Sequence, residues 1–172
     1  MTAVKVQTAL GSVPDANAYI DAPSVIAYWA QRGVVLTDSP ELDAAIVAAT
    51  DYIDNNFRFI GRKLLGRSQR TQWPRSGAID RDLNLVEGIP YEVVEATAEY
   101  TKRVVIDGID LLPDSGQEPL VTQRSEEVGP IKETFHYARP TSPSYPVADN
   151  RMRNAGLLRN DSRRLFGDIR RS

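Results

Sequence analysis

The sequence predicts a mainly α protein: a small helical bundle with a short β-hairpin and an extended C-terminal arm. Two segments place apolar residues at three- and four-residue intervals, which is typical of amphipathic helices. A later stretch alternates apolar and polar residues, the pattern of a strand. We divide the 172 residues into an extended lead-in at 1–20, a helical core at 21–112, a linker with a hairpin at 113–146, and a short helix with a basic docking arm at 147–172.

The first helix is expected to begin after Asp21, which is a good N-cap residue. Pro23 suits the first turn, and Gly33 is expected to end the helix. Its apolar side consists of Val25, Ile26, Tyr28 and Trp29.

The clearest helix is expected at about residues 40–55. Ser39 is its N-cap, Pro40 takes the first helical position, and acidic residues occupy the first turn, where the helix dipole favours them. Its buried face is predicted from the spacing of Leu42, Ala45, Ile46, Ala49, Tyr52, Ile53 and Phe57.

Residues 58–88 are expected to form a loop that is basic in its first half. The cations there are Arg58, Arg62, Lys63, Arg67, Arg70 and Arg75. The segment Trp73-Pro74-Arg75 excludes a helix, because proline keeps the preceding residue extended. Either Trp73 is a stacking platform for single-stranded nucleic acid, or it fills the core while Arg75 caps a carbonyl or pairs with an acid. The second interpretation is favoured, since a platform usually has more than one ring.

A second long helix is expected from Pro90 to about residue 107, with Gly108 as its end. Acidic residues lie near its start and basic residues near its end, as the helix dipole favours. Its apolar stripe is predicted from Val93, Thr97, Tyr100, Thr101, Val104 and Val105.

Beyond residue 118 the pattern changes to short strands. Residues 120–128 and 131–137 flank Gly129-Pro130, and the second run alternates, so we expect a β-hairpin. The prolines of residues 140–146 predict a stiff linker, and residues 147–158 a short helix.

The charge of the chain is uneven. Residues 151–172 hold seven arginines and two aspartates, a net charge of +5, whereas the whole chain carries −2, so residues 1–150 carry −7. An acidic body with an arginine-rich tail predicts docking through the tail, on an acidic protein or a nucleic acid.

We predict that the C-terminal arm binds the partner. Large apolar side chains are interleaved with its arginines, which is typical of an interface and uncommon in an idle, solubilising tail, the alternative interpretation. The predicted docking residues are Arg151, Arg153, Arg159, Arg163, Arg164, Leu165, Phe166, Ile169, Arg170 and Arg171. The predicted structural loop consists of Trp73, Pro74 and Arg75.

No pattern in the chain predicts enzyme activity, a metal or a cofactor. There is no cysteine, no apolar run of membrane length and no secretory signal at residues 1–10. His136 stands alone on a predicted strand. Asp51 and Asp54 are better explained as a solvated helix face than as a shared site, and Asp80-Arg81-Asp82 resembles a cation loop in composition only.

Several segments resemble the head–tail connector (adaptor) proteins of tailed bacteriophages. They are residues 44–54, Gly61-Arg62-Lys63, residues 72–77, residues 89–96 and residues 125–132. The resemblance covers about residues 15–140, and Trp-Pro-Arg is its most specific part. Close relatives are also labelled putative DnaT-like single-stranded-DNA-binding proteins.

The resemblance implies a structural connector at the neck of the virion, made in the host cytoplasm. Such a subunit would form a ring of about twelve copies under the portal protein, bridge to the next neck or tail protein, and extend a channel for the genomic DNA. The basic arm would dock on the portal. The alternative is a module of phage replication that binds single-stranded DNA through the basic stretch 58–75 with Trp73.

Overall fold

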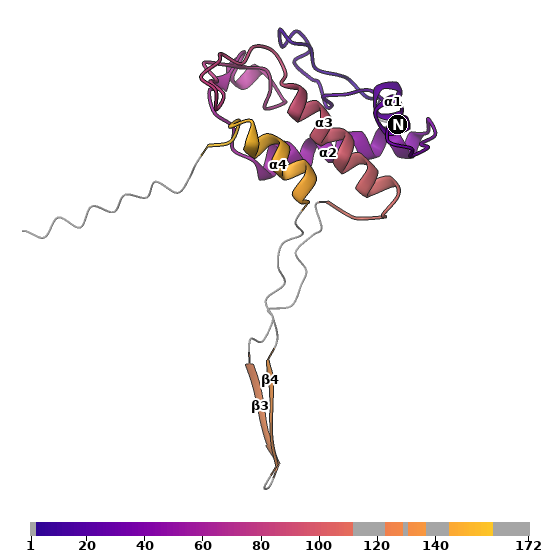
Figure 1. The fold of residues 1–172 in the computed structure, drawn as a ribbon, viewed down its shortest axis with the longest axis vertical. Coiled ribbons are helices and arrows are strands. Elements are labelled where there is room, and N and C mark those ends of the chain that lie inside the picture. The colour runs from indigo at the N-terminus through magenta and orange to yellow at the C-terminus, as the bar shows by residue number, and fades with distance from the viewer. Residues whose placement is uncertain (1–2, 112–122, 129–130, 137–144, 160–172) are drawn as a thin grey trace, which may run out of the picture.

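The computed structural model describes residues 3–111, 123–128, 131–136 and 145–159, with only the backbone described for the two strands after residue 122. In the described part, four helices form the body and two strands form a hairpin, so the predicted fold class is confirmed. The helices are α1 (Ala22–Ala30), α2 (Pro40–Asn56), α3 (Tyr91–Val105) and α4 (Pro146–Asn154). Figure 1 shows α2 and α3 crossing at the centre, with α4 beside α3.

The first two helices begin where their caps predict. The Asp21 side chain accepts a hydrogen bond from the Ser24 backbone N–H, and Ser39 Oγ accepts one from Leu42 N–H. Both caps satisfy an amide that has no partner inside the helix. Local sequence therefore fixes these two starts.

Helix α3 lacks a side-chain cap at Pro90 and depends on its packing. Its buried face includes Thr97 and Thr101, whose hydroxyls donate to the carbonyls of Val93 and Thr97, four residues earlier. These bonds satisfy the hydroxyls within the helix, which lets them lie in an apolar interior.

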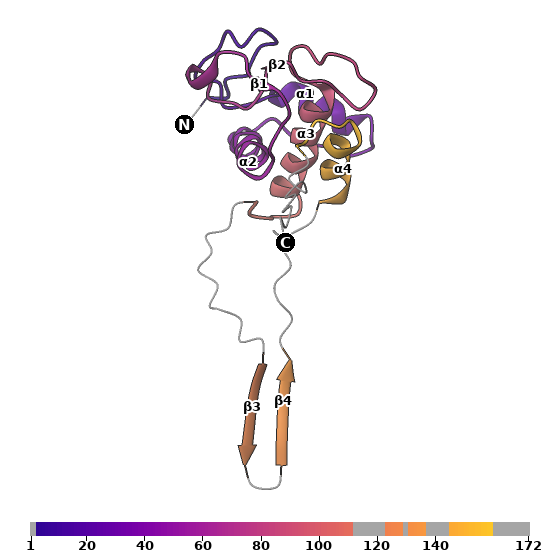
Figure 2. The same ribbon diagram turned by 90° about the vertical axis from the view of Figure 1, so that its left-hand side faces the viewer.

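Two groups of buried side chains make up the core. One joins α2, α3 and α4 to the loop after α2, and includes Trp73, Tyr100 and Met152. The other joins α1 to the first half of α2 and includes Trp29 and Leu42. Figure 2 shows α3 between α2 and α4.

The loop after α2 is held by Trp73, which is fully buried. Its ring lies edge-on to Phe59, with centroids 5.6 Å apart. The Arg75 guanidinium donates to the carbonyls of Ile60 and Gly61 at 2.6 and 2.9 Å. The interpretation of Trp73 as core and Arg75 as a carbonyl cap is confirmed, and the stacking-platform interpretation is wrong because no face of the tryptophan is accessible.

The same loop contains a two-stranded ladder that the sequence did not predict. Strand β1 (Arg62–Lys63) pairs antiparallel with β2 (Arg75–Ser76), and the 3₁₀ helix η1 (Gly66–Ser68) lies between them. Lys63 Nζ donates to the carbonyls of Gln69 and Arg70. Two cations of the basic stretch, Lys63 and Arg75, therefore serve the loop itself.

Asp54 anchors the loop to α2. Its Oδ1 accepts from the Tyr19 hydroxyl at 2.5 Å and its Oδ2 from Gln72 N–H at 3.0 Å. The Tyr19 oxygen in turn accepts from the backbone N–H of Trp73 at 3.1 Å. The expectation that Asp54 belongs to a solvated helix face is therefore wrong, because its carboxylate is bonded to the loop. Burial raises the pKa of Asp54 to about 6.

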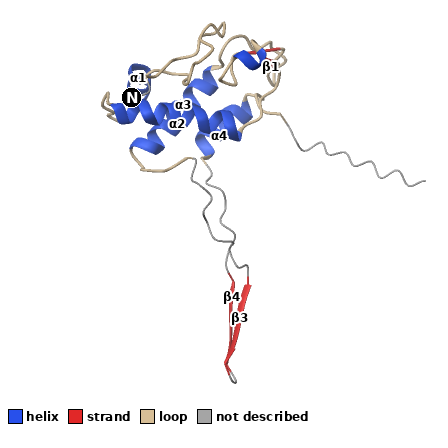
Figure 3. Cartoon of the chain, turned by 180° about the vertical axis from the view of Figure 1, so that it is seen from behind, coloured by secondary structure: helices blue, strands red, loops and turns tan. Residues whose placement is uncertain are grey.

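The predicted hairpin is present as β3 (Gln123–Val128) and β4 (Ile131–His136), coloured red in Figure 3. The strands are antiparallel, and Val128 pairs with Ile131 on either side of Gly129-Pro130. His136 ends β4, and its side chain lies outside the described part.

The segment after the hairpin returns to the body. Met152 of α4 and Leu157 beyond it are buried in the core that contains Trp73 and Tyr100. The short helix expected at 147–158 is present as α4, and the segment around it packs on the other helices. Residues 160–172, which hold most of the expected polar arm, lie outside the described residues.

In residues 3–111 and 145–159, no helix is long and apolar enough to cross a membrane. The side chains described there also include no cluster of three histidine or acidic residues suited to a metal ion.

The raised pKa of Asp54 predicts a pH dependence of stability. Its carboxyl has a pKa near 6 in the folded protein and near 3.8 when it is fully solvated, as in the unfolded chain. Between pH 3.8 and pH 6 the folded state therefore binds more protons than the unfolded state. The free energy of unfolding should therefore fall by about 2 kcal/mol between about pH 4.5 and 7, relative to the Asp54→Asn variant. Urea denaturation at several pH values measures this difference. Parallel profiles for the two proteins would contradict the assignment.

Candidate nucleic-acid interface

Helix α4 ends in a Schellman motif that turns the chain toward the loop after α2. Gly156 has a φ of +75°, its N–H donates to the Arg153 carbonyl, and Leu157 N–H donates to the Met152 carbonyl. The buried contact of Met152 and Leu157 in one core is the usual companion of this motif. The motif directs residues 157–159 alongside residues 58–60.

Residues 155–159, called here the return segment, are bonded on two sides. On one side Ile60 N–H donates to the Leu157 carbonyl at 3.0 Å, and Arg159 N–H donates to the Arg58 carbonyl at 2.8 Å. On the other side Arg81 N–H donates to the Ala155 carbonyl at 3.2 Å. Three distant parts of the chain thereby meet.

Gly156 is required by this close approach. A Cβ atom there would lie 2.8 Å from the backbone nitrogen of Arg81, closer than real Cβ atoms come. Glycine also adopts the positive φ without strain. The glycine thus brings Arg81 next to the end of α4.

A groove of about 580 Å³ opens where these segments meet, called here the arginine groove. Its lining residues are Asn56, Phe57, Arg58, Arg81, Arg153, Gly156, Leu158 and Arg159. Four of the eight are arginines, and none is acidic. Guanidinium groups bind phosphate oxygens through paired N–H donors, so this lining suits a phosphate-bearing ligand.

The groove arginines lie at the surface. Arg58, Arg81, Arg153 and Arg159 are all exposed. In the described part of the chain, no carboxylate pairs with the side chains of Arg81, Arg153 or Arg159. Their positive charge is therefore directed at solvent.

Phe57 contributes an aromatic ring to the same groove. It is half-buried and lies edge-on to Tyr52, with ring centroids 6.1 Å apart. The Tyr52 contact holds the ring in place, and Phe57 is one of the residues that line the groove. Arginines next to an aromatic ring are components of single-strand binding surfaces, and Phe57 is the one half-buried ring among the residues that line this groove.

Residues 3–171 match the model of one family, described as putative DnaT-like ssDNA binding protein. The chain belongs to this family. No curated protein and no solved structure matches it.

Membership of the DnaT-like family corrects the function expected from the sequence. The head–tail connector interpretation, with its ring, is wrong, because the matching family is described by single-stranded DNA binding and not by a structural role in a virion. The portal contact and the location at the virion neck stay predictions that depended on that interpretation.

The residues predicted for the docking arm lie in different places in the structure. Arg153 and Arg159 lie in the arginine groove. Arg151 instead faces the body of this DnaT-like protein. The remaining predicted residues lie outside the described part: Arg163, Arg164, Leu165, Phe166, Ile169, Arg170 and Arg171.

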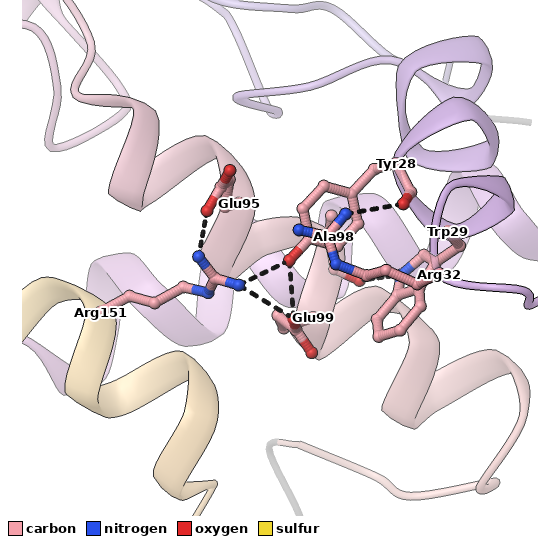
Figure 4. Close-up of polar contacts among 7 residues, drawn as sticks. All are labelled: Tyr28, Trp29, Arg32, Glu95, Ala98, Glu99 and Arg151. Atoms are coloured by element: carbon pink, nitrogen blue, oxygen red, sulfur yellow. Dashed lines mark hydrogen bonds and ion pairs between the residues drawn. The ribbon is translucent and has the colours of Figure 1, made fainter.

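Arg151 clamps α4 to the rest of the body (Figure 4). Its guanidinium pairs with Glu95 and lies 3.5 Å from Glu99 of α3, and it donates to the Tyr28 hydroxyl oxygen at 3.0 Å. Tyr28 in turn donates to Glu99 at 2.7 Å, and burial together with this bond raises the pKa of the tyrosine. Arg151 therefore stabilises the fold of its own chain, and the docking role expected for it stays a prediction.

Sequence reasoning missed Arg58 and Arg81 as members of one site. They are separated by the whole Trp73 loop. Arg81 also stands between two aspartates, so the net charge of residues 80–82 is negative and does not indicate a basic site. The one available signal was Gly156-Leu157 after a helical run, which indicates a Schellman end and a change of chain direction.

Removing the clamp should destabilise the protein without removing a groove residue. We expect Arg151→Gln to lower the free energy of unfolding by about 1–3 kcal/mol, because Glu95 and Glu99 lose their partner while partly buried. Arg153→Gln makes the same change of charge on the exposed face of α4 and is the matched control. Equal unfolding midpoints for the two variants in urea would contradict the role of Arg151.

Gly156→Ala should separate the return segment from Arg81. Gly33 has the same φ of +75°, but a Cβ added there would meet nothing within 4 Å, so Gly33→Ala measures the cost of the positive φ alone. We expect Gly156→Ala to cost at least about 1 kcal/mol more than Gly33→Ala, because the added carbon meets backbone. Thermal or urea unfolding of both variants tests this, and equal costs would show that the contact is not tight.

Proposed function

We propose that this protein binds single-stranded DNA through the arginine groove, as a binding protein and not an enzyme. The observation that carries the proposal is the convergence of four arginines from three parts of the chain on one groove without a carboxylate. The description of the family supports the same ligand.

The electrostatic argument begins with the phosphates. A strand of DNA carries one charge per nucleotide, and binding to arginines releases its condensed counterions. Arg58 and Arg159 lie on adjacent, hydrogen-bonded segments, and the Arg81 backbone is bonded to the return segment that follows Arg153. The cations thus line one continuous surface that a flexible backbone can follow.

The acidic remainder of the protein restricts where the strand binds. The chain as a whole carries −2, so a strand is repelled by most of the body and attracted to the local cluster. In the sequence, Arg163, Arg164, Arg170 and Arg171 follow the last groove residue. They would add phosphate contacts beyond the groove.

Phe57 favours single-stranded over duplex DNA. A half-buried ring in the groove offers a surface to an unpaired base, whereas the bases of a duplex are stacked on each other and unavailable. The buried Trp73 takes no part in this contact, so the site differs from the 58–75 platform considered from the sequence.

The test is a salt-dependent titration of a labelled oligo-dT strand of about 20 nucleotides. We expect Arg81→Gln and Arg153→Gln each to weaken binding about three- to tenfold and to reduce the salt slope by about 0.7, the value for one lost phosphate contact. Neither substitution removes a hydrogen bond or ion pair of the described side chains, so the unfolding midpoint should not move.

Arg67→Gln is the matched control, because Arg67 is exposed, belongs to the basic stretch 58–75 and does not line the groove. It should leave affinity nearly unchanged. If Arg67→Gln weakens binding as much as Arg81→Gln, the strand follows the basic stretch and the groove assignment is wrong. If the unmodified protein binds no strand even at low salt, the function itself is wrong.

A further inference from the structure

The turn at residues 80–84 presents an unusual residue beside the arginine groove. Leu83 has a φ of +68°, the one positive φ of a non-glycine residue among those described, and its side chain is 84% exposed. A left-handed leucine costs free energy that asparagine or glycine would largely avoid. Because the side chain is exposed, it gains little packing free energy within the fold to offset the strain of this conformation.

The turn is rigid despite its exposure. Asp80 Oδ1 accepts from the backbone N–H of Asp82 at 2.9 Å and of Asn84 at 2.8 Å. The Asp80 N–H donates to the Asn84 carbonyl at 2.9 Å, which closes the turn from the other side. The Asp80-Arg81-Asp82 sequence is therefore explained by the turn. The Asp80 carboxylate accepts hydrogen bonds from backbone N–H groups of the same turn.

The turn is continuous with the arginine groove through Arg81. That residue lines the groove, and its N–H is bonded to the return segment. Leu83 follows two positions later, and Ile79 and Leu85, which pair across the base of the turn, are 52% and 59% exposed. Exposed aliphatic side chains thus stand two positions before and two positions after the groove residue Arg81 in the chain.

We propose that Leu83 contacts the bases of a single strand whose phosphates lie in the arginine groove, an inference that rests on the proposed function. Asp80 and Asp82 disfavour a phosphate at the turn, whereas the face of an unpaired base is apolar and uncharged. A strand held by Arg81 then places phosphates in the groove and a neighbouring base against Leu83. Strained residues on rigid turns are frequent at ligand contacts.

The experiment compares Leu83→Asn with the unmodified protein in the oligo-dT titration. Asparagine tolerates the left-handed conformation better than leucine, so the melting temperature should stay the same or rise. Affinity should nevertheless fall about fivefold, as expected when part of a leucine's apolar contact is lost, with an unchanged salt slope because no charge is removed. Val35→Asn, at an 87% exposed valine between α1 and α2, is the control and should leave affinity unchanged.

The outcomes separate the two proposals. If the unmodified protein binds the strand and Leu83→Asn binds equally well, the base contact is wrong and the arginine groove stands. If Leu83→Asn alters sedimentation of the free protein but not its affinity, the turn is a self-association surface and the base contact is again wrong. If the unmodified protein binds no strand, both proposals fail together.

Discussion

The pairing of the return segment with residues 58–60 is the contact on which the rest of the architecture depends. It joins the C-terminal part of the described chain to the loop that Trp73 and Arg75 organise, and Leu157 completes the core at the junction. The Arg151 clamp holds α4 at the angle from which the Schellman turn can reach that loop. Without this return, Arg153 and Arg159 would be separated from Arg58 and Arg81, and the groove would lose half of its lining.

The arginines of this protein divide into two kinds according to what surrounds them. Arg75 and Arg151 are partly buried and satisfy carbonyls or carboxylates of their own chain. Arg81 and Arg153 are exposed and face solvent beside a ring and an aliphatic turn. A buried guanidinium needs its partners to offset desolvation, whereas an exposed one keeps its hydration until a ligand replaces it. Residue type alone therefore does not predict which arginine binds DNA.

Local rules predicted the helices well. Asp21 and Ser39 cap the helices that they were expected to cap, and the two predicted strands pair as an antiparallel hairpin. These signals act within a few residues, where backbone geometry is decided. The functional prediction was wrong because the family that the chain matches is described by single-stranded DNA binding, which no local rule indicates. Local rules also did not show that Met152 and Leu157 bury their side chains in this chain's own core. A periodic pattern shows that a face is apolar but not which surface covers it.

The sequence by itself determined the helical class, the three main helix positions, the hairpin and the concentration of arginine near the C-terminus, because each follows from local propensity or simple charge. Only the tertiary structure decided that Trp73 is inaccessible, that Arg151 is internal, and that Arg58, Arg81, Arg153 and Arg159 share one groove. Those facts depend on contacts between residues far apart in the chain, such as the bond between Arg159 and Arg58 and the bond between Arg151 and Tyr28, which lie 123 positions apart. Such contacts are selected by the packing of the whole chain, which no local pattern records.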